Sequence, residues 1–174
     1  MSSWQPVYIG VGSNLNEPVN QVQNAIEELA EIPDTMRVLV STLVHSPPLG
    51  ECAQPDYINA VVALVTQLAP ESLLDILQRI ESEHGRTRSG KRWDARTLDL
   101  DILVFGARRI ATERLTVPHP HLHERSFVLG PLNELAPDLW ITGLGAVRVL
   151  AQQIDFSELQ PLTEYGHRKT IGAN

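Results

Sequence analysis

The sequence predicts an α+β fold, a ferredoxin-like βαββαβ sandwich with C-terminal additions. Apolar and β-branched stretches of strand length alternate with stretches whose apolar residues recur at helical spacing. Their order is strand, helix, strand, strand, helix, strand, which is the split βαβ pattern. The chain has 174 residues and shows no internal repeat, linker or low-complexity segment, so residues 1–174 are expected to form a single domain.

The first half of the pattern ends in a long loop. Residues 6–12, PVYIGVG, are apolar and end at a Ser-Asn turn signal, which predicts a buried strand. A helix is expected from Pro18 to about Glu31, because proline is favoured in a first helical turn and apolar residues follow at helical spacing. Residues 36–45 alternate as a strand does, and the proline- and glycine-rich residues 46–56 predict the loop.

The second half repeats strand, helix and strand. Residues 57–66 are β-branched and apolar and predict a strand. Pro70 is expected to begin a helix with an apolar stripe, ending near Gly85. Residues 98–105 predict the last strand of the pattern. Residues 108–110 and 124–136 are expected to add a short edge strand and a further core helix.

Charge and cysteine content exclude several classes of protein. The formal net charge is −7, whereas general nucleic-acid binders are usually basic, so no nucleic-acid partner is expected. Cys52 is the only cysteine, which excludes an intrachain disulfide and favours a reducing compartment. The sequence has no secretory signal and no run of about 20 apolar residues, so a cytoplasmic protein without a membrane partner is expected. No predicted helix or strand is more apolar than a core needs, which favours a monomer.

Basic residues gather in one part of this acidic chain. Residues 79–125 carry a net charge of +3 and the remainder carries −10. That distribution suits a compact anion such as a nucleoside triphosphate better than a long polyanion. Five basic side chains lie in one Gly- and Ser-containing loop, where guanidinium groups could pair with phosphate oxygens; they are Arg86, Arg88, Lys91, Arg92 and Arg96.

Two carboxylates follow this loop on the strand over residues 98–105. Asp99 and Asp101 are two residues apart, so both side chains leave one face of the strand, with Cα atoms roughly 6.5–7 Å apart. Carboxylate oxygens are the ligands that Mg²⁺ prefers, with substrate phosphates and water completing each octahedron. The basic loop beside two carboxylates predicts a Mg²⁺-dependent enzyme acting on a nucleotide.

Three further features have less specific interpretations. Trp93 in the basic loop could cover a planar heterocycle or anchor the loop. Of His119, His121 and His123, one is expected to reach a phosphate and two to lie on the surface, since two prolines disfavour a converging zinc site. Residues 10–14, GVGSN, lack the third glycine of a dinucleotide fingerprint, so these glycines are expected to permit a tight turn.

Six segments occur together in one order, namely YIGVGSN (8–14), SPPLG (46–50), QPDYINAV (54–61), QRIE (78–81), GRTRSGKRWDARTLDLDIL (85–103) and ERLTVPHPHLHERSFVLGPL (113–132). With them the chain resembles the 6-hydroxymethyl-7,8-dihydropterin pyrophosphokinases of the folate pathway over about residues 7–140. The resemblance implies transfer of pyrophosphate from ATP to the hydroxymethyl group of a reduced pterin, with release of AMP. It also implies the ferredoxin-like fold and assigns no function to the tail beyond residue 140.

The resemblance also implies roles for individual residues. Asp99 and Asp101 would hold two Mg²⁺ ions, and with Arg86 and Arg96 they would form the catalytic set. The positions around ATP would be Gln78, Glu81, Arg88, Arg92, Trp93, Arg96, Ile102, Arg114, Thr116, His119 and Arg125. The pterin pocket would contain Ser46, Pro47, Leu49, Tyr57, Asn59, Trp93 and Phe127, with Tyr57 and Phe127 as its aromatic walls. Two positions depart from the family: Ser46 replaces a frequent threonine, and Pro120 stands where some members have tyrosine.

Two other functions are compatible with parts of the pattern. A nucleotidyltransferase of the same fold would also use Mg²⁺ and a nucleotide, but it would release pyrophosphate rather than AMP. A ferredoxin-like module that binds RNA would usually carry aromatic residues along its exposed strands and a basic balance. Only nine Phe, Trp and Tyr residues occur in this acidic chain, which disfavours the RNA-binding module.

Overall fold

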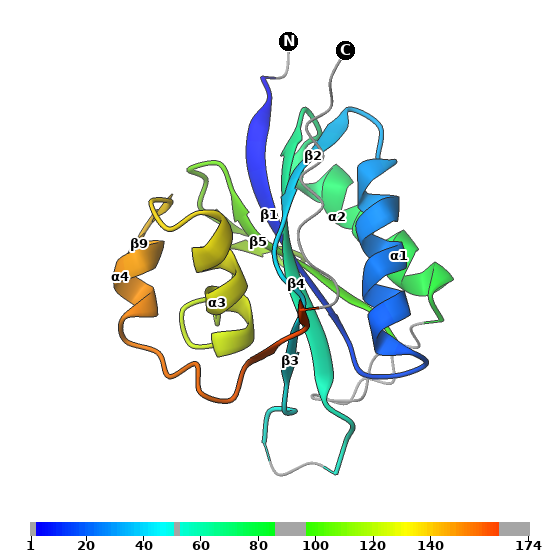
Figure 1. Cartoon of the computed structure of the whole chain (residues 1–174). Helices are drawn as coiled ribbons and strands as arrows, with labels where there is room; N and C mark the ends of the chain where they lie inside the picture. The colour runs from blue at the N-terminus through cyan, green and yellow to red at the C-terminus, as the bar shows by residue number, and fades with distance from the viewer. Residues whose placement is uncertain (1–2, 51–52, 86–96, 164–174) are drawn as a thin grey trace.

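The computed structural model of the chain describes residues 3–50, 53–85 and 97–163 (Figure 1). Their helices and strands are, in chain order, β1 (Gln5–Ser13), α1 (Pro18–Ala30), β2 (Thr35–Val40), β3 (Val44–Ser46), β4 (Tyr57–Thr66), α2 (Pro70–Glu83), β5 (Asp99–Phe105), β6 (Ile110–Ala111), β7 (Thr116–Val117), α3 (Ser126–Leu135), β8 (Trp140–Ile141), β9 (Gly145–Ala146), α4 (Val147–Ala151) and β10 (Gln160–Pro161). Helices and an antiparallel sheet share one fold, so the predicted α+β class is confirmed. None of the described helices is long and apolar enough to cross a membrane.

Both predicted helices begin at their prolines, because a residue in the first turn needs no N–H for the helix ladder. The apolar stripe of α1 is buried at Val22, Ala25, Ile26 and Leu29. The stripe of α2 is buried at Leu73, Leu74, Leu77 and Ile80. Each helix therefore packs onto the sheet along the face that the sequence periodicity predicted.

One predicted strand, residues 36–45, is divided in the structure into β2 and β3. The break lies at Ser41, which is buried. Its hydroxyl accepts a hydrogen bond from the Val61 amide at 2.8 Å, and its own amide donates to the Val61 carbonyl at 2.9 Å. β2 and β3 both pair with β4, on either side of this break. The serine side chain thus satisfies the backbone where the strand is interrupted.

The main sheet has the strand order β10-β3-β4-β1-β5, with β2 also paired to β4. The pairs of β1 with β4, β1 with β5, β2 with β4 and β3 with β4 are all antiparallel. β4 and β1 are therefore central strands, and β5 lies beside β1 with its other side away from the sheet. This arrangement places residues of β1, β4 and β5 side by side on each face.

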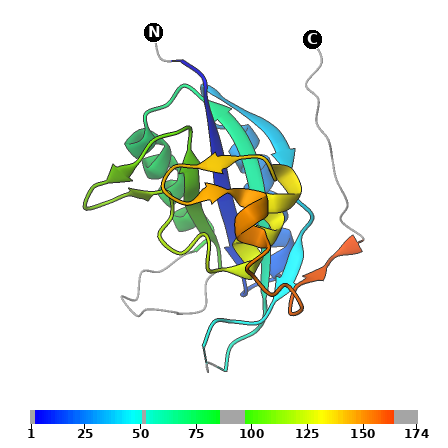
Figure 2. The same ribbon diagram turned by 90° about the vertical axis from the view of Figure 1, so that its left-hand side faces the viewer.

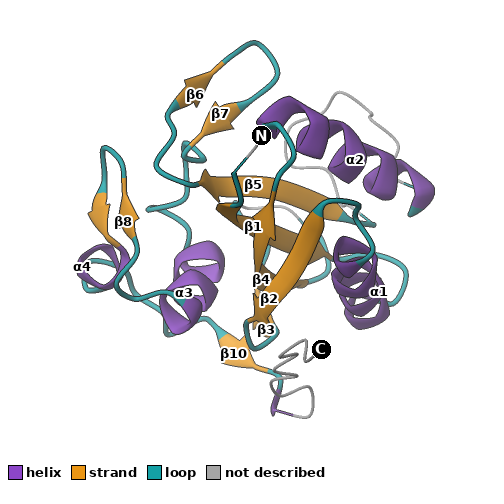
Figure 3. Cartoon of the chain, turned by 90° about the horizontal axis from the view of Figure 1, so that it is seen from above, coloured by secondary structure: helices purple, strands orange, loops and turns teal. Residues whose placement is uncertain are grey.

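The sheet separates two apolar cores. One face packs against α1 and α2 and buries Val7, Ile9 and Phe105. The other face packs against α3 and α4 and buries Val61, Leu103 and Leu129. Figures 1 and 3 show the two pairs of helices on opposite sides of the sheet. Figure 2 looks onto the second layer, where α3, α4 and the short β8 and β9 strands lie in front of the sheet.

A β-bulge interrupts the pairing of β1 with β5. Ile9 is opposite Ile102, but Tyr8 is opposite Val104, so Leu103 is the additional residue. A bulge places two successive residues against one partner and redirects their side chains. Leu103 and Val104 both enter the core beside α3, although neighbouring residues of a regular strand would lie on opposite faces.

Candidate functional site

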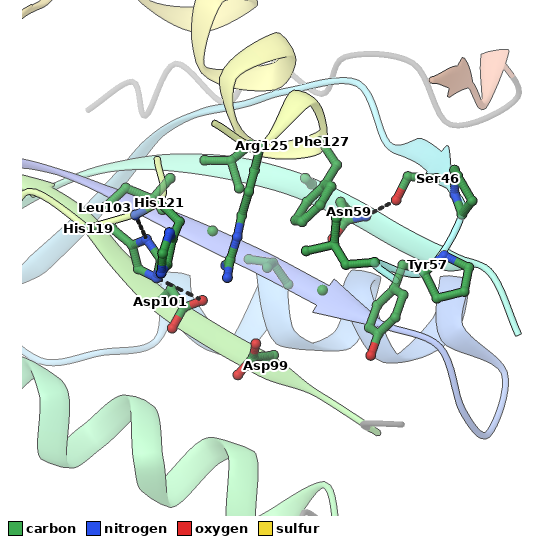
Figure 4. Close-up of a pocket in the computed structure, with 18 of the residues that line it drawn as sticks. Ser46, Tyr57, Asn59, Asp99, Asp101, Leu103, His119, His121, Arg125 and Phe127 are labelled. Carbon is green, nitrogen blue, oxygen red and sulfur yellow. Dashed lines mark hydrogen bonds and ion pairs between the residues drawn. The ribbon is translucent and has the colours of Figure 1, made fainter. Parts of the chain in front are cut away.

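A cavity of about 270 Å³ opens on the face of the sheet that carries α3 (Figure 4). Strands β1, β3, β4 and β5, the loop after β3, the segment after β7 and the start of α3 all contribute to it. Its lining residues are Gly10, Val11, Gly12, Ser46, Pro47, Pro48, Leu49, Gln54, Tyr57, Asn59, Ala60, Asp99, Asp101, Leu103, His119, His121, Arg125, Phe127 and Val128.

Asp99 and Asp101 line this cavity from β5. Leu100 and Ile102, the alternate residues, are buried in the core beside α1 and α2. The prediction that both carboxylates share one strand face is therefore confirmed. The Asp101 side chain keeps 41% of its surface exposed, so its oxygens are accessible from the cavity.

His119 lies against these carboxylates because of the β-bulge. Its backbone amide donates to the carbonyl of Leu103 at 2.9 Å. The imidazole Nδ1 accepts a hydrogen bond from the His121 amide at 3.2 Å, so the ring proton belongs on Nε2. That nitrogen lies 3.9 Å from an Asp101 carboxylate oxygen. A strand irregularity thus holds an imidazole beside Asp101 (Figure 4).

The His119 imidazole is neutral near pH 7. Burial, followed by the positive charge of Arg125, lowers its pKa to about 4. The nearby Asp99 opposes this shift but does not outweigh it. His119 can therefore donate a hydrogen bond from Nε2 without adding charge to the site.

His121 also lines the cavity and keeps 43% of its side chain exposed, so it lies at the surface of the cavity mouth, in accord with the prediction that two of the histidines are surface residues. Its Nδ1 is 2.9 Å from the carboxylate of Glu124, which fixes the ring at the cavity wall. The spacing of the three histidines does not indicate whether a given histidine lines a cavity or faces solvent.

The far end of the cavity lies between Tyr57 at the start of β4 and Phe127 at the start of α3. Asn59 lies between them on β4 and is buried (Figure 4). Its amide nitrogen donates to the hydroxyl of the buried Ser46 at 2.9 Å. This bond orients the carboxamide, with its nitrogen toward Ser46 of β3. The side chain of Ser46 therefore has a structural role, at a position where the family often has threonine.

Gly10 and Gly12 form the floor of the cavity, not a tight turn, which corrects the sequence interpretation. Both lie within β1. A Cβ at Gly12 would come within 2.9 Å of the Asn59 side-chain oxygen, and one at Gly10 would come within 3.3 Å of Leu103. Glycine in a strand interior often marks such a close approach.

Arg125 enters the cavity from the residue before α3. Its guanidinium carbon lies 5.9 Å from the centre of the Phe127 ring, within the range of a cation–π contact. The cavity therefore has a cation near the two carboxylates and two aromatic side chains at the other end.

Asn14 supports the cavity without lining it, a role that the sequence analysis missed. Its buried amide nitrogen donates to the Pro55 carbonyl at 3.0 Å and to the Gln54 side chain at 3.3 Å. These bonds connect the end of β1 to the chain just before Tyr57. The residues around Asn14 predicted only a turn at this position.

Several residues expected around ATP lie outside this cavity. Thr116 is exposed on β7, and Gln78 is half-buried on α2. Arg114 forms ion pairs with Asp75 and Glu71 of α2, and the hydrogen bond and charge of Asp75 raise its pKa. These residues belong instead to α2, to β7 and to the segment before β7, and both α2 and β7 pack beside the outer edge of β5.

Glu81 and Ile102 occupy that edge in different ways. The buried Glu81 carboxylate accepts a hydrogen bond from the Leu100 amide at 2.8 Å. This amide thus points away from β1, and the alternation of an antiparallel ladder gives the amide and carbonyl of Ile102 the same direction. The Ile102 side chain is buried, so only its backbone groups face the edge.

Five predicted site residues lie outside the described residues. They are Arg86, Arg88, Arg92, Trp93 and Arg96.

The model of the 7,8-dihydro-6-hydroxymethylpterin-pyrophosphokinase (HPPK) family matches residues 8–137, the part of the chain that carries every wall of the cavity. The chain belongs to this family. Among its HPPK relatives, the 2-amino-4-hydroxy-6-hydroxymethyldihydropteridine pyrophosphokinase of Haemophilus influenzae is 48% identical over 146 residues, which are 84% of this chain and 91% of that one. The enzyme of the same name from Pseudomonas aeruginosa is 53% identical over 135 residues, 78% of this chain and 83% of that one.

Solved structures of the HPPK-DHPS protein of Plasmodium falciparum share the fold. One of them, with pteroate, matches 92% of this chain with a TM-score of 0.71 at 14% sequence identity. The match covers 44% of that longer chain, so this chain spans less than half of it. At this identity the comparison describes the fold alone.

The donor groups of this HPPK cavity fit Mg²⁺. Asp99 and Asp101 offer hard carboxylate oxygens on one strand face. Within the described residues no group of three or more His, Cys, Asp and Glu side chains could hold a metal ion. Further ligands would therefore come from substrate phosphates and water, as Mg²⁺ in nucleotide sites commonly requires.

Proposed function

We propose that this cavity is where the chain transfers a pyrophosphoryl group from ATP to the hydroxymethyl group of 6-hydroxymethyl-7,8-dihydropterin. The products are the pterin pyrophosphate and AMP, and the reaction belongs to folate biosynthesis. Membership of the HPPK family carries the activity. One observation carries its location: the paired carboxylates of Asp99 and Asp101 share a cavity with two aromatic side chains and a buried carboxamide.

The acceptor half of the site is proposed to lie between Tyr57 and Phe127. The faces of a flat heterocycle stack well between aromatic rings, while its polar edge needs hydrogen-bonding groups. Asn59 offers a carboxamide oxygen beside Gly12, since its nitrogen is already bonded to Ser46. The remaining proposed contacts of the pterin are Pro47, Leu49 and Trp93.

The nucleotide half is proposed to follow the outer edge of β5. The outward backbone groups of Ile102 could recognise the edge of an adenine ring, because no strand within the described residues pairs with β5 on that side. Arg125 and the neutral His119 offer donors to phosphate oxygens from the cavity side. The other proposed ATP contacts are Gln78, Glu81, Arg88, Arg92, Trp93, Arg96, Arg114 and Thr116.

Asp99 and Asp101 are proposed to hold two Mg²⁺ ions, which would neutralise phosphate charge and orient the triphosphate. The pterin hydroxyl oxygen forms the new bond to the β-phosphorus, the bond from that phosphorus to the α-phosphate oxygen breaks, and the hydroxyl proton is lost. The residues of this chain contribute by holding the two substrates in line, since positioning and charge stabilisation dominate phosphoryl transfer. Arg86 and Arg96 are proposed to assist this transfer.

The ferredoxin-like assignment is also a proposal. Its support is the strand order β3-β4-β1-β5, entirely antiparallel, with α1 and α2 on one face. A single domain over residues 1–174, a monomeric state and a cytoplasmic location are further proposals of the sequence analysis.

AMP release tests the proposed function. The protein is mixed with ATP, Mg²⁺ and 6-hydroxymethyl-7,8-dihydropterin, and AMP and pyrophosphate are measured separately. AMP should appear only when pterin and Mg²⁺ are both present. Free pyrophosphate in place of AMP would indicate nucleotidyl transfer, and AMP formation without pterin would indicate hydrolysis of ATP.

A further inference from the structure

Residues 152–163, here called the strap, connect α3, which carries Phe127 of the proposed acceptor pocket, with β3, which carries Ser46. The strap follows α4, passes α3 and ends beside β3, and its path is visible in Figures 1 and 2. It lies beyond residues 8–137, which the family model matches. No function is predicted for these residues from the sequence.

At its first contact the strap packs against α3. A Cβ at Gly130 would lie 3.0 Å from a methyl carbon of Leu159 and 3.4 Å from the Phe156 ring. The absence of a side chain at Gly130 therefore allows the strap to approach the helix closely. Gly130 is three residues after Phe127, so it lies about one turn further along nearly the same helix face.

The strap holds its own shape at this contact. The Ser157 amide and hydroxyl donate to the Asp155 carboxylate at 2.8 and 2.9 Å. The Leu159 amide donates to the Phe156 carbonyl at 3.0 Å, closing a turn. These bonds present Phe156 and Leu159 together, as a preformed apolar pair.

At its second contact the strap extends the sheet. In β10, Gln160 pairs with His45 and Pro161 with Val44, and the Leu162 amide donates to the Leu43 carbonyl at 2.8 Å. β3 is only three residues long and ends at Ser46, the partner of Asn59. Without β10, the backbone groups on the outer side of β3 would lose their strand-pairing partner.

We infer that the strap is a positioning element of the acceptor pocket. It joins α3, which carries Phe127, to β3, which carries Ser46, and thereby sets the distance between the aromatic wall and the carboxamide support. Glu134 of α3 forms a separate connection, accepting hydrogen bonds from the Thr42 amide and hydroxyl at 3.0–3.1 Å. The fold of α3 against the sheet therefore does not depend on the strap alone. This inference rests on the proposed function.

The test distinguishes an effect of the strap on the position of the pterin-binding residues from an effect on the stability of the whole protein. Phe156→Ala removes strap packing and Gly130→Ala forces the strap away from α3, so the two changes disturb the same contact in opposite ways. Each should raise the KM for pterin about tenfold, because small misplacements of a binding group are costly, while the KM for ATP changes less than about twofold. Val22→Ala, in the core beside α1, is the matched control for lost stability, and Val149→Ala, on the exposed face of α4, is the control for a neutral change.

Steady-state kinetics on the whole chain, with thermal unfolding of each variant, decide the outcome. A higher KM for pterin in both strap variants, but not in Val22→Ala at an equal loss of stability, would support the inference. Strap variants that lose stability with unchanged KM values, or that raise both KM values equally, would overturn it. Wild-type protein without pterin-dependent AMP release would overturn the proposed function, and the inference with it.

Discussion

Gly12 and Asn59 form a contact that depends on the absence of one methyl group. The Asn59 carboxamide is held on one side by Ser46 and on the other passes directly over Gly12. Because the first bond fixes the amide, it cannot turn freely to make room for a larger residue at position 12. The acceptor pocket is thus sensitive to changes in residues that carry no functional group.

Gly12→Ala should raise the KM for pterin by about tenfold or more, because the new Cβ would lie 2.9 Å from the Asn59 oxygen and displace it. The KM for ATP should change little. Gly10→Ala is the matched control, since its Cβ would meet a Leu103 side chain at 3.3 Å, which can shift slightly. Equal KM values for pterin in the two variants would contradict this account.

Ser46→Ala removes the acceptor of the buried Asn59 amide. An unpaired buried donor costs about 1–3 kcal/mol, so both the unfolding free energy and the affinity for pterin should fall. Pterin affinity is measured by isothermal titration in the presence of a non-hydrolysable ATP analogue. Ser46→Thr keeps the hydroxyl and should restore binding; a threonine variant as weak as the alanine one would show that the hydroxyl is not the relevant group.

Asp99→Ala should lose several kcal/mol of transition-state stabilisation, because it removes a proposed Mg²⁺ ligand, and AMP release should fall at least about a hundredfold. Direct Mg²⁺ titration of the ATP complex gives an independent measurement. Asp138→Ala, at an exposed carboxylate that pairs with Arg148, is a control outside the cavity. Activity of Asp99→Ala within tenfold of wild type would exclude the metal assignment.

Among single residues, the sequence could predict those whose chemistry is visible in their type and spacing. Asp99 and Asp101 are two residues apart on an alternating strand, and they do share one face. Gly12 could not be placed, because the sequence alone does not distinguish a glycine within a strand from one in a turn. Asn14 acts through a hydrogen bond to Pro55, 41 residues away, which no local pattern contains.

The elements adjoining the site show how β5 is supported at its outer edge. Glu81 of α2 accepts the Leu100 amide, and the Leu103 carbonyl at the bulge accepts the His119 amide. Two neighbouring segments therefore satisfy part of an edge to which no strand in the described part of the chain pairs. Between them, β5 presents Asp99 and Asp101 to the cavity.

Glu81→Ala should lower the free energy of unfolding by about 2 kcal/mol, since the Leu100 amide would lose its buried acceptor. Chemical denaturation gives this value. Glu81→Gln keeps an oxygen that can accept the same bond, so it should lose less. If both variants are equally destabilised, the charge of Glu81 matters more than this bond.

The periodicity of apolar residues predicted the helices and strands, but it did not predict the break at Ser41 or the bulge at Leu103. Residues 36–45 alternate throughout, yet Ser41 divides them, because its hydroxyl competes for the backbone of Val61. The bulge at Leu103 has no signal in the apolar stretch of β5, since Leu, Val and Phe suit either face. Both irregularities arise from pairing with distant strands.

At the scale of the whole molecule, the sheet divides the chain into two layers with unequal roles. The layer of α1 and α2 packs behind the sheet, whereas the layer of α3 and α4 borders the cavity. The order of elements in the sequence predicted the first layer. The second depends on how the chain after β5 crosses the opposite face, which the order alone did not determine.

Leu29→Ala and Leu129→Ala compare the two layers. Both side chains are fully buried, so each change should cost about 2–5 kcal/mol of stability. Leu29 belongs to the core behind the sheet and should leave both KM values unchanged. Leu129, two residues after Phe127, should also raise the KM for pterin. Kinetics are measured below the unfolding transition of each variant. If Leu29→Ala raised the KM for pterin as much as Leu129→Ala does, the proposed difference between the two layers would be wrong.

The division of the cores by the sheet has a practical consequence for engineering a heat-resistant form of this enzyme. Substitutions that improve packing between α1 and the sheet add stability on the side away from the cavity, so rigidity gained there should leave substrate entry and product release undisturbed. The same kind of substitution around α3 would stiffen the walls that admit the pterin. A search for stabilising changes is therefore best confined at first to residues 18–30, because α2 carries Gln78 and Glu81, two of the proposed ATP contacts.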